Sequence, residues 1–125
     1  MQNVSNPLQH KTEVISDEYI KVVLQGRITE SASASSLVSE VTGLLSPEMN
    51  QVIIDLKEID YINSNGLNSL IAILTKTRTR GGDMVIFDVN SKIEKLLLIT
   101  KLNTVFNIAK TEKEAIEILK LKKQN

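Results

Sequence analysis

The sequence contains no cysteine and no tryptophan, and it has only two tyrosines, two phenylalanines and one histidine among 125 residues. Without cysteine the chain forms neither disulfides nor thiolate metal sites, and it has no cysteine nucleophile. The shortage of aromatic side chains argues against a surface on which single-stranded nucleic acid would stack. This composition fits a reducing compartment, of which the cytoplasm is the ordinary example.

An excess of charge of one sign is also missing, because 15 Lys and Arg residues balance 15 Asp and Glu residues. Such a chain has no overall electrostatic attraction to nucleic acid or to an anionic membrane. Fully apolar runs such as "LLLI" at 96–99 are too short to cross a membrane, and "MQNVSNPLQHK" does not resemble a secretory signal. We therefore expect a cytoplasmic protein without a nucleic-acid partner and without membrane insertion.

The remaining composition is that of a globular protein, with 42% hydrophobic and 24% charged residues. A chain of this length is expected to form one domain with a real core. Residues 1–11 are polar and include Pro7, so we expect a flexible N-terminal arm there. The predicted domain spans residues 12–121, and residues 122–125 form a short tail.

Hydrophobic periodicity predicts an α/β protein. The segments "TEVISD" and "YIKVVLQG" are expected to form two strands joined by a turn at 16–18, while "QVIIDL" and "MVIFDV" predict central strands covered on both faces. Helical spacing predicts helices at 31–45, before Gly81-Gly82, after Ser91 and after Thr111, and "TVFNIA" predicts a last strand. The order β-β-α-β-α-β-α-β-α implies a mixed, mostly parallel sheet with the first strand antiparallel at or near an edge.

The sequence offers few groups for catalysis. His10, the one histidine, lies in the predicted arm, which argues against a catalytic triad or a multi-histidine metal site. Asp55, Asp60 and Asp88 fall at or just beyond the predicted strand ends, where a small phosphotransfer or hydrolytic enzyme could bind Mg²⁺. The alternative is that they are turn residues, which is favoured because no acidic pair follows the first long strand.

A small polar cluster, Asn63-Ser64-Asn65-Gly66, interrupts the chain where a strand passes into a helix. A serine at such a junction is typically the N-cap of the helix. The same position tolerates a phosphoryl group, because free backbone N–H groups and the helix dipole favour negative charge there. Gly66 leaves room for a partner's backbone, and the two asparagines offer uncharged donors and acceptors. Such a junction suits docking.

The segments "VVLQGRIT", "VIIDLKEIDYINSNGLNSL" and "GGDMVIFDV", in this order, resemble the STAS domains, named for sulfate transporters and bacterial anti-sigma factor antagonists. The resemblance covers about residues 12–120. The family's motif places Asp-Leu before a short spacer and Asp-Ser-Ser/Thr-Gly-Leu. Here Asp55-Leu56 matches its first part, and Ser64, Gly66 and Leu67 match the second.

The resemblance implies a regulatory binding protein that is not itself an enzyme. In the antagonist branch, an anti-sigma factor that is also a serine kinase phosphorylates the motif's first serine, here Ser64, and a serine phosphatase removes the phosphate. The unphosphorylated antagonist binds the kinase and so frees a sigma factor. ATP and Mg²⁺ belong to the kinase, so this chain is expected to need no cofactor. The residues implied in partner binding are Arg27, Thr29, Asn63, Ser64, Asn65, Gly66 and Leu67.

The chain departs from the antagonist pattern at three positions. Asn63 replaces the usual Asp, Asn65 replaces the second Ser or Thr, and Thr29 stands where antagonists commonly have Asp. An alternative therefore keeps the fold without the switch. In that alternative the chain is a STAS subunit of a lipid-transport or stress-sensing assembly, and Ser64 is only a helix cap.

Overall fold

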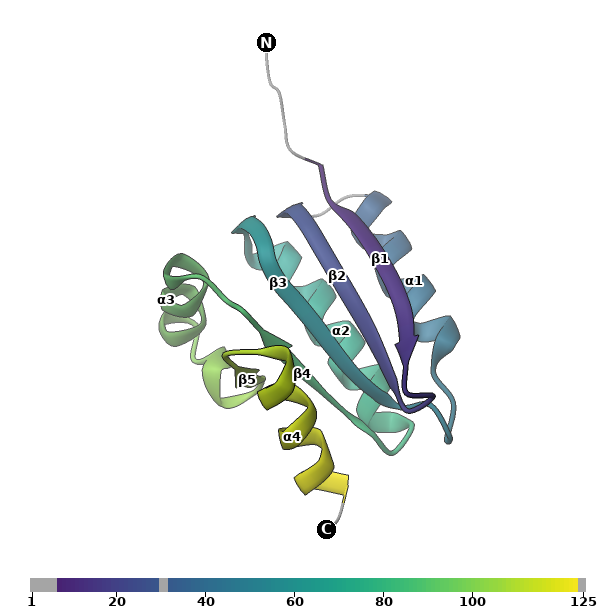
Figure 1. Ribbon diagram of the computed structural model, residues 1–125. Coiled ribbons are helices and arrows are strands. Elements are labelled where there is room, and N and C mark those ends of the chain that lie inside the picture. Colours follow the sequence, from purple (N-terminus) through teal and green to yellow (C-terminus); the bar gives the residue numbers. More distant parts are fainter. Residues whose placement is uncertain (1–6, 30–31, 124–125) are drawn as a thin grey trace.

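The computed structural model describes residues 7–29 and 32–123 (Figure 1). The elements follow in the order β1 (Gln9–Ile15), β2 (Tyr19–Ile28), α1 (Ala32–Leu44), β3 (Gln51–Ile62), α2 (Ser64–Thr79), β4 (Asp83–Phe87), α3 (Ser91–Ile99), the 3₁₀ helix η1 (Leu102–Thr104), β5 (Asn107–Ala109) and α4 (Glu112–Lys123). The predicted α/β class and element order are confirmed. In these two described stretches, no helix combines the length and apolar character that crossing a membrane requires.

The five strands form one sheet whose spatial order, β1-β2-β3-β4-β5, is the order of the chain. β1 is antiparallel to β2 and lies at one edge, while all the other neighbours are parallel, as predicted. The turn between β1 and β2 has positive φ at Ser16 and Asp17, and the Glu18 N–H donates to the Ile15 carbonyl. Small polar residues at positive φ suit a tight hairpin.

The folded part extends beyond the predicted limits of 12 and 121. β1 begins at Gln9, and α4 continues to Lys123. His10, which was predicted to lie in a loose arm, is a half-buried residue of β1, and its Nε2 lies 3.1 Å from Glu40 Oε1 on α1. Residues 1–6, 124 and 125 of the predicted arm and tail lie outside the described residues.

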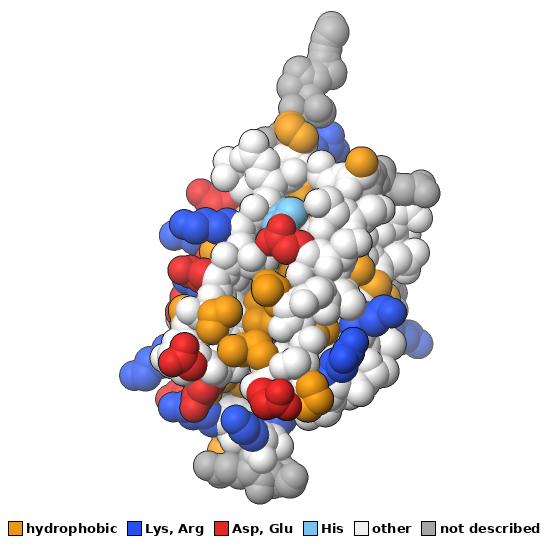
Figure 2. Space-filling model, turned by 90° about the vertical axis from the view of Figure 1, so that its right-hand side faces the viewer, with side chains coloured by type: hydrophobic (Ala, Val, Ile, Leu, Met, Phe, Trp, Pro, Cys, Tyr) orange, Lys and Arg blue, Asp and Glu red, His pale blue; other side chains and the backbone are white. Residues whose placement is uncertain are grey.

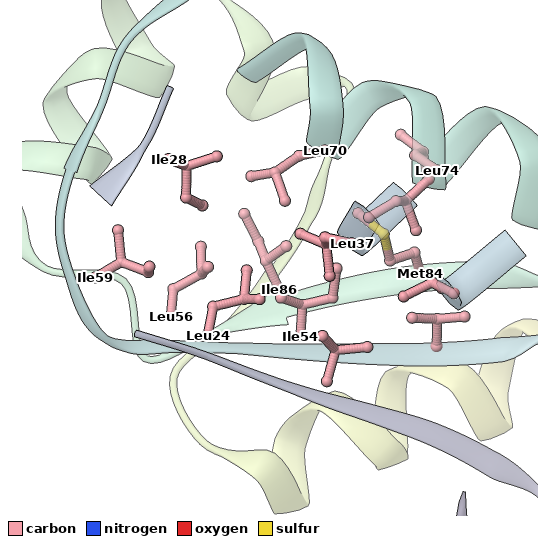
Figure 3. Packing of buried hydrophobic residues seen from close by; sticks show 14 of the residues in the cluster. Leu24, Ile28, Leu37, Ile54, Leu56, Ile59, Leu70, Leu74, Met84 and Ile86 are labelled. Atoms are coloured by element: carbon pink, nitrogen blue, oxygen red, sulfur yellow. The ribbon is translucent and has the colours of Figure 1, made fainter. Parts of the chain in front are cut away.

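The sheet separates two hydrophobic clusters. On one face, α1 and α2 pack against inward-pointing residues of β2, β3 and β4 (Figure 3). On the other face, α4 covers a smaller cluster to which Tyr19, Ile53, Val85, Phe87, Ala109, Ala115 and Leu119 contribute. This double burial explains why the sequences of β3 and β4 are continuously apolar rather than alternating.

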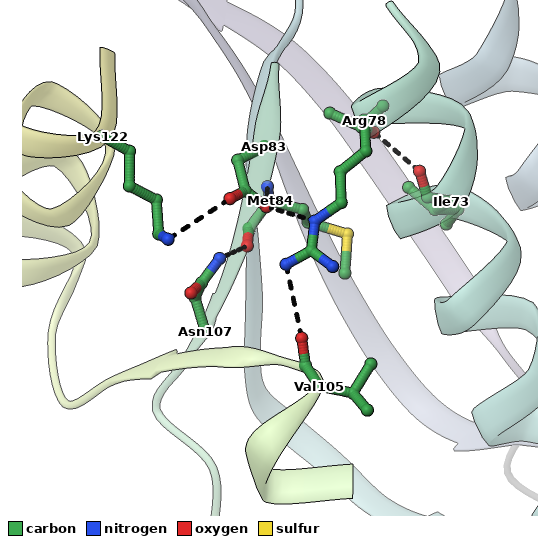
Figure 4. A network of polar contacts seen from close by, with 8 residues as sticks. Ile73, Arg78, Asp83, Met84, Val105, Asn107 and Lys122 are labelled. Atoms are coloured by element: carbon green, nitrogen blue, oxygen red, sulfur yellow. Dashed lines mark hydrogen bonds and ion pairs between the residues drawn. The ribbon is translucent and has the colours of Figure 1, made fainter. Parts of the chain in front are cut away.

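Ion pairs hold α4 to the sheet at both of its ends. Near its start, Glu112 lies 2.6 Å from Lys21 Nζ on β2, and this hydrogen bond raises the pKa of Lys21. Near its end, Lys122 Nζ lies 3.6 Å from Asp83 on β4, whose carboxylate also accepts from Arg78 on α2 (Figure 4). Asp83 therefore links helices that lie on opposite faces of the sheet.

β3 is twice as long as the predicted strand, because it continues past residue 56 to Ile62. Its register against β2 shifts twice, so β3 uses two more residues than β2 over the same length. Each shift resets the alternation, and Leu56, Ile59 and Ile62 all point into the core. The extension brings the end of β3 beside the end of β2, immediately before α2 begins.

Candidate functional site

The junction between β3 and α2 is capped by Asn63. This residue has extended backbone angles, φ −105° and ψ −176°, and its Oδ1 accepts from the Gly66 N–H at 2.8 Å. Its own N–H donates to the Ile28 carbonyl of β2 at 3.3 Å. The prediction that Ser64 caps this helix was therefore wrong, because the cap lies one residue earlier.

Ser64 is instead the first residue of α2, and it is exposed to solvent. The capping hydrogen bond does not involve its hydroxyl. The first turn of α2 contains no acidic residue, although α3 and α4 each have at least one in their first turns. Because the start of a helix favours negative charge, this first turn can accommodate a charge added to Ser64.

Gly66 makes its close approach within the chain rather than to a partner. A Cβ at this position would lie 2.0 Å from the carbonyl oxygen of Ile28, so only glycine lets α2 pack this tightly on β2. Leu67 is 3% exposed and belongs to the main core. Both residues were predicted to contact a partner, but they lie inside the molecule, below the surface that a partner could touch.

Arg27 and Tyr61 form an exposed pair at the ends of β2 and β3. They are register partners, and the Arg27 guanidinium lies 4.3 Å from the centroid of the Tyr61 ring. Thr29, one residue beyond β2, is partly buried. Tyr61 was not among the predicted site residues. The available signal was its place three residues before Ser64, but the strand was expected to end before it.

The structure thus divides the predicted site residues into two groups. Asn63, Ser64 and Asn65 begin α2, and Arg27 lies at the adjoining end of β2, where the Asn63 backbone is anchored. Beside them is a hollow of about 230 Å³ between the end of β3 and α3, lined by Asp60, Tyr61, Ile62, Lys92, Ile93 and Leu96. Gly66 and Leu67 support this surface from inside.

The three aspartates of the enzyme hypothesis do not form a site. Asp55 lies within β3, where its Oδ1 accepts from the Lys57 N–H, and Asp60 follows five positions later in the same strand. Asp88 follows β4 at φ 59°. Over residues 7–29 and 32–123, no group of three or more His, Asp or Glu side chains is placed to hold a metal ion.

Comparison with known proteins shows the family to which the chain belongs. The STAS domain model matches residues 11–115, so the chain belongs to the STAS domain family, as the resemblance predicted. A relative from Bordetella bronchiseptica, named "Putative anti-sigma factor antagonist BtrV", is 25% identical over 104 residues, which cover 83% of this chain and 89% of the relative.

Solved structures agree with this assignment at the level of the fold. An anti-sigma factor antagonist from Mycobacterium paratuberculosis superposes with a TM-score of 0.78 at 18% identity, covering 94% of this chain and 99% of that one. The unphosphorylated form of the antagonist SpoIIAA gives 0.73 at 14% identity, covering 90% and 96%. Its phosphorylated form gives 0.67 at 15% identity, covering 87% and 97%.

Proposed function

We propose that this protein is an anti-sigma factor antagonist of the cytoplasm whose partner binding is switched by phosphorylation of Ser64. The unphosphorylated protein binds an anti-sigma factor that is also a serine kinase, and this binding frees a sigma factor. Phosphate transfer from ATP to the Ser64 hydroxyl ends the interaction, and a serine phosphatase restores it. ATP and Mg²⁺ are bound by the kinase.

The observation that carries this proposal is that different residues cap α2 and present a hydroxyl at its start. Asn63 caps the helix, so the hydroxyl of Ser64 is exposed and is not required for the cap. Names of relatives and structural neighbours support the antagonist function, and SpoIIAA is a neighbour whose structure exists in both phosphorylation states.

Charge and desolvation account for the switch. A phosphoserine adds about 1.5 to 2 negative charges to the docking surface, which would be made for a neutral hydroxyl. The domain itself tolerates that charge, because α2 begins there and has no acidic residue in its first turn. Phosphorylation therefore acts by weakening the fit to the partner, without a large change in the backbone.

The test begins with the intact mass of the protein from its native cells, with and without phosphatase treatment, followed by peptide mapping of residues 50–76. We expect a phosphatase-sensitive phosphate on Ser64. In pull-downs from the same cells, Ser64→Ala is expected to retain a sigma-binding serine kinase and Ser64→Asp to lose it. Asp at the start of a helix is stabilising, so unfolding does not explain such a loss.

Ser91 provides a matched control, because it is also exposed and also follows a capping asparagine at the start of a helix. Ser91→Asp is expected to retain the kinase. If Ser64 is unmodified across growth conditions and Ser64→Asp keeps every partner, the switch is wrong. That result would support the non-switching STAS subunit of a lipid-transport or stress-sensing assembly.

A further inference from the structure

One long edge of the sheet has no strand paired with it among the described residues. β1 is seven residues long and pairs with β2 on one side only, whereas β5 at the opposite edge has three residues. An edge strand presents a row of unpaired N–H and C=O groups, and long edges without proline are templates for another strand. β1 contains no proline and no register shift against β2.

The pairing of β1 with β2 determines which backbone groups face outward. The Ile15 carbonyl points toward β2, because it accepts from the Glu18 N–H in the turn. Backbone direction alternates along an antiparallel strand, so His10, Thr12 and Val14 direct their N–H and C=O groups away from β2. Thr12 is the middle residue of the strand, and its outward groups can therefore pair with those of an identical residue about a two-fold axis.

The charges of β1 favour this two-fold register over the registers shifted by two residues. With Thr12 opposite Thr12 of a second copy, Lys11 of each copy lies opposite Glu13 of the other, on one face of the sheet. A shift of two residues either way sets Lys11 against Lys11 or Glu13 against Glu13. Opposite charges in directly opposed positions are stabilising, and like charges are destabilising. Lys11 and Glu13 therefore favour the register in which the Thr12 residues of two identical strands lie opposite each other.

The surface beside β1 is compatible with close approach. Glu40 of α1 accepts hydrogen bonds from Thr12 Oγ1 at 2.7 Å and from His10 Nε2 at 3.1 Å, and these bonds lower the pKa of Glu40. Both carboxylate oxygens of Glu40 are therefore already hydrogen-bonded within the chain. Figure 2 shows this edge, where hydrophobic side chains gather below the histidine; Val14 and Leu44 are exposed by 48% and 39%.

We propose that the edge of β1 binds a second copy of this chain, with antiparallel β1 strands pairing about a two-fold axis at Thr12. The pairing joins two five-stranded sheets into one continuous sheet and covers Val14 of each copy. The formal net charge of zero removes overall repulsion between the copies. The Ser64 surface lies at the end of the parallel strands rather than at this edge, so each copy keeps its own.

The test measures self-association of the full chain by sedimentation velocity up to about 1 mM, together with hydrogen exchange of the backbone amides. We expect a monomer–dimer equilibrium, with protection of the amides of residues 10, 12 and 14 that grows with concentration. Lys11→Glu and Glu13→Lys are each expected to weaken association at least about tenfold, since each creates two like-charge oppositions in the dimer.

Two rescues identify the register. A mixture of Lys11→Glu and Glu13→Lys chains is expected to form a heterodimer. One chain then has Glu at positions 11 and 13 and the other has Lys at both, so each opposed pair again joins an acidic and a basic side chain. The double variant is expected to self-associate like the wild type. Lys95→Glu, the same charge change at an exposed site on α3, serves as the control and is expected to change nothing. A chain that stays monomeric at about 1 mM, or a dimer that ignores both single substitutions, overturns the proposal.

Discussion

Two helices of this protein begin with the same pair of residues, an asparagine followed by a serine. In Asn63-Ser64 and in Asn90-Ser91 the asparagine side chain caps the helix, and the serine is the first helical residue. Asn and Ser are both good caps, so local preference does not decide between them. At α2 the hydrogen bond from the Asn63 N–H to the Ile28 carbonyl of β2 holds the asparagine in the extended conformation. Asn63 is therefore the N-cap, and Ser64 is the first helical residue.

The two residues are therefore expected to differ in their contribution to stability. Asn63→Ala removes the hydrogen bond to the Gly66 N–H and should lower the free energy of unfolding by about 1 kcal/mol. Ser64→Ala should change it by less than about 0.5 kcal/mol, because the hydroxyl does not cap the helix. Urea unfolding of both variants measures the difference. A larger loss in Ser64→Ala than in Asn63→Ala would return the cap to Ser64.

At the scale of single residues, the sequence indicated the right junction and the wrong cap. The identification of Ser64 as the phosphoacceptor does not depend on capping and stays a prediction. The interpretation of Gly66 was wrong because it needed a long-range contact. The backbone that approaches Gly66 belongs to Ile28, which is 38 positions earlier in the chain. Contacts between distant segments of this kind are invisible to local reasoning.

At the scale of elements, the contact between α2 and β2 keeps the site rigid. The Ile28 carbonyl accepts from the Asn63 N–H, and the same carbonyl occupies the space where a Gly66 side chain would begin. A helix whose first turn is fixed in this way cannot move outward without losing the hydrogen bond from the Asn63 N–H to the Ile28 carbonyl. This is the structural reason for expecting phosphorylation to act on the surface alone.

Substitution of two helical glycines tests how tight this contact is. Gly66→Ala forces the α2 and β2 backbones apart and should lower the free energy of unfolding by about 3 kcal/mol or more. Gly43→Ala in α1 meets nothing within 4 Å and should raise it by about 0.5 to 1 kcal/mol. Chemical denaturation of the pair measures both signs. Equal effects at the two positions would contradict the close packing.

β3 shows where element prediction from sequence reaches its limit. Its first half is continuously apolar and was predicted, whereas the second half, "KEIDYI", has polar residues where a regular strand would point inward. The two register shifts against β2 restore the inward direction of Ile59 and Ile62. Such shifts depend on the neighbouring strand, and for this reason the strand that carries Tyr61 to the site was expected to end at residue 56.

At the scale of the whole molecule, the hydrophobic clusters on the two faces of the sheet differ in size. Helices α1, α2 and α3 contribute to the larger cluster on one face, while α4 is the described helix that closes the smaller cluster on the other. α4 depends on Leu119 and Ala115, which are fully buried, and on its ion pairs to Lys21 and Asp83. The sequence predicted this helix correctly, because Thr111 and Glu114 form hydrogen bonds at its start.

The smaller cluster is expected to be essential to the folded state. Leu119→Ala leaves a cavity under α4 and should lower the free energy of unfolding by about 3 kcal/mol. Leu121→Ala, in the same helix but with 65% of the residue exposed, should change it by less than about 0.5 kcal/mol. Thermal unfolding followed by circular dichroism distinguishes them. Similar losses at the two positions would show that α4 is not anchored by the cluster.

The spatial order of the strands, which repeats their order in the chain, bears on how the protein is made. Each strand lies beside the strand synthesised immediately before it, so no strand has to wait for a distant segment in order to find its neighbour. The β1–β2 hairpin can form first, and each later strand can add to an existing edge as it leaves the ribosome. Growth in this direction leaves the β5 side open until last, and α4, which seals the second face, arrives only when synthesis of the sheet is complete.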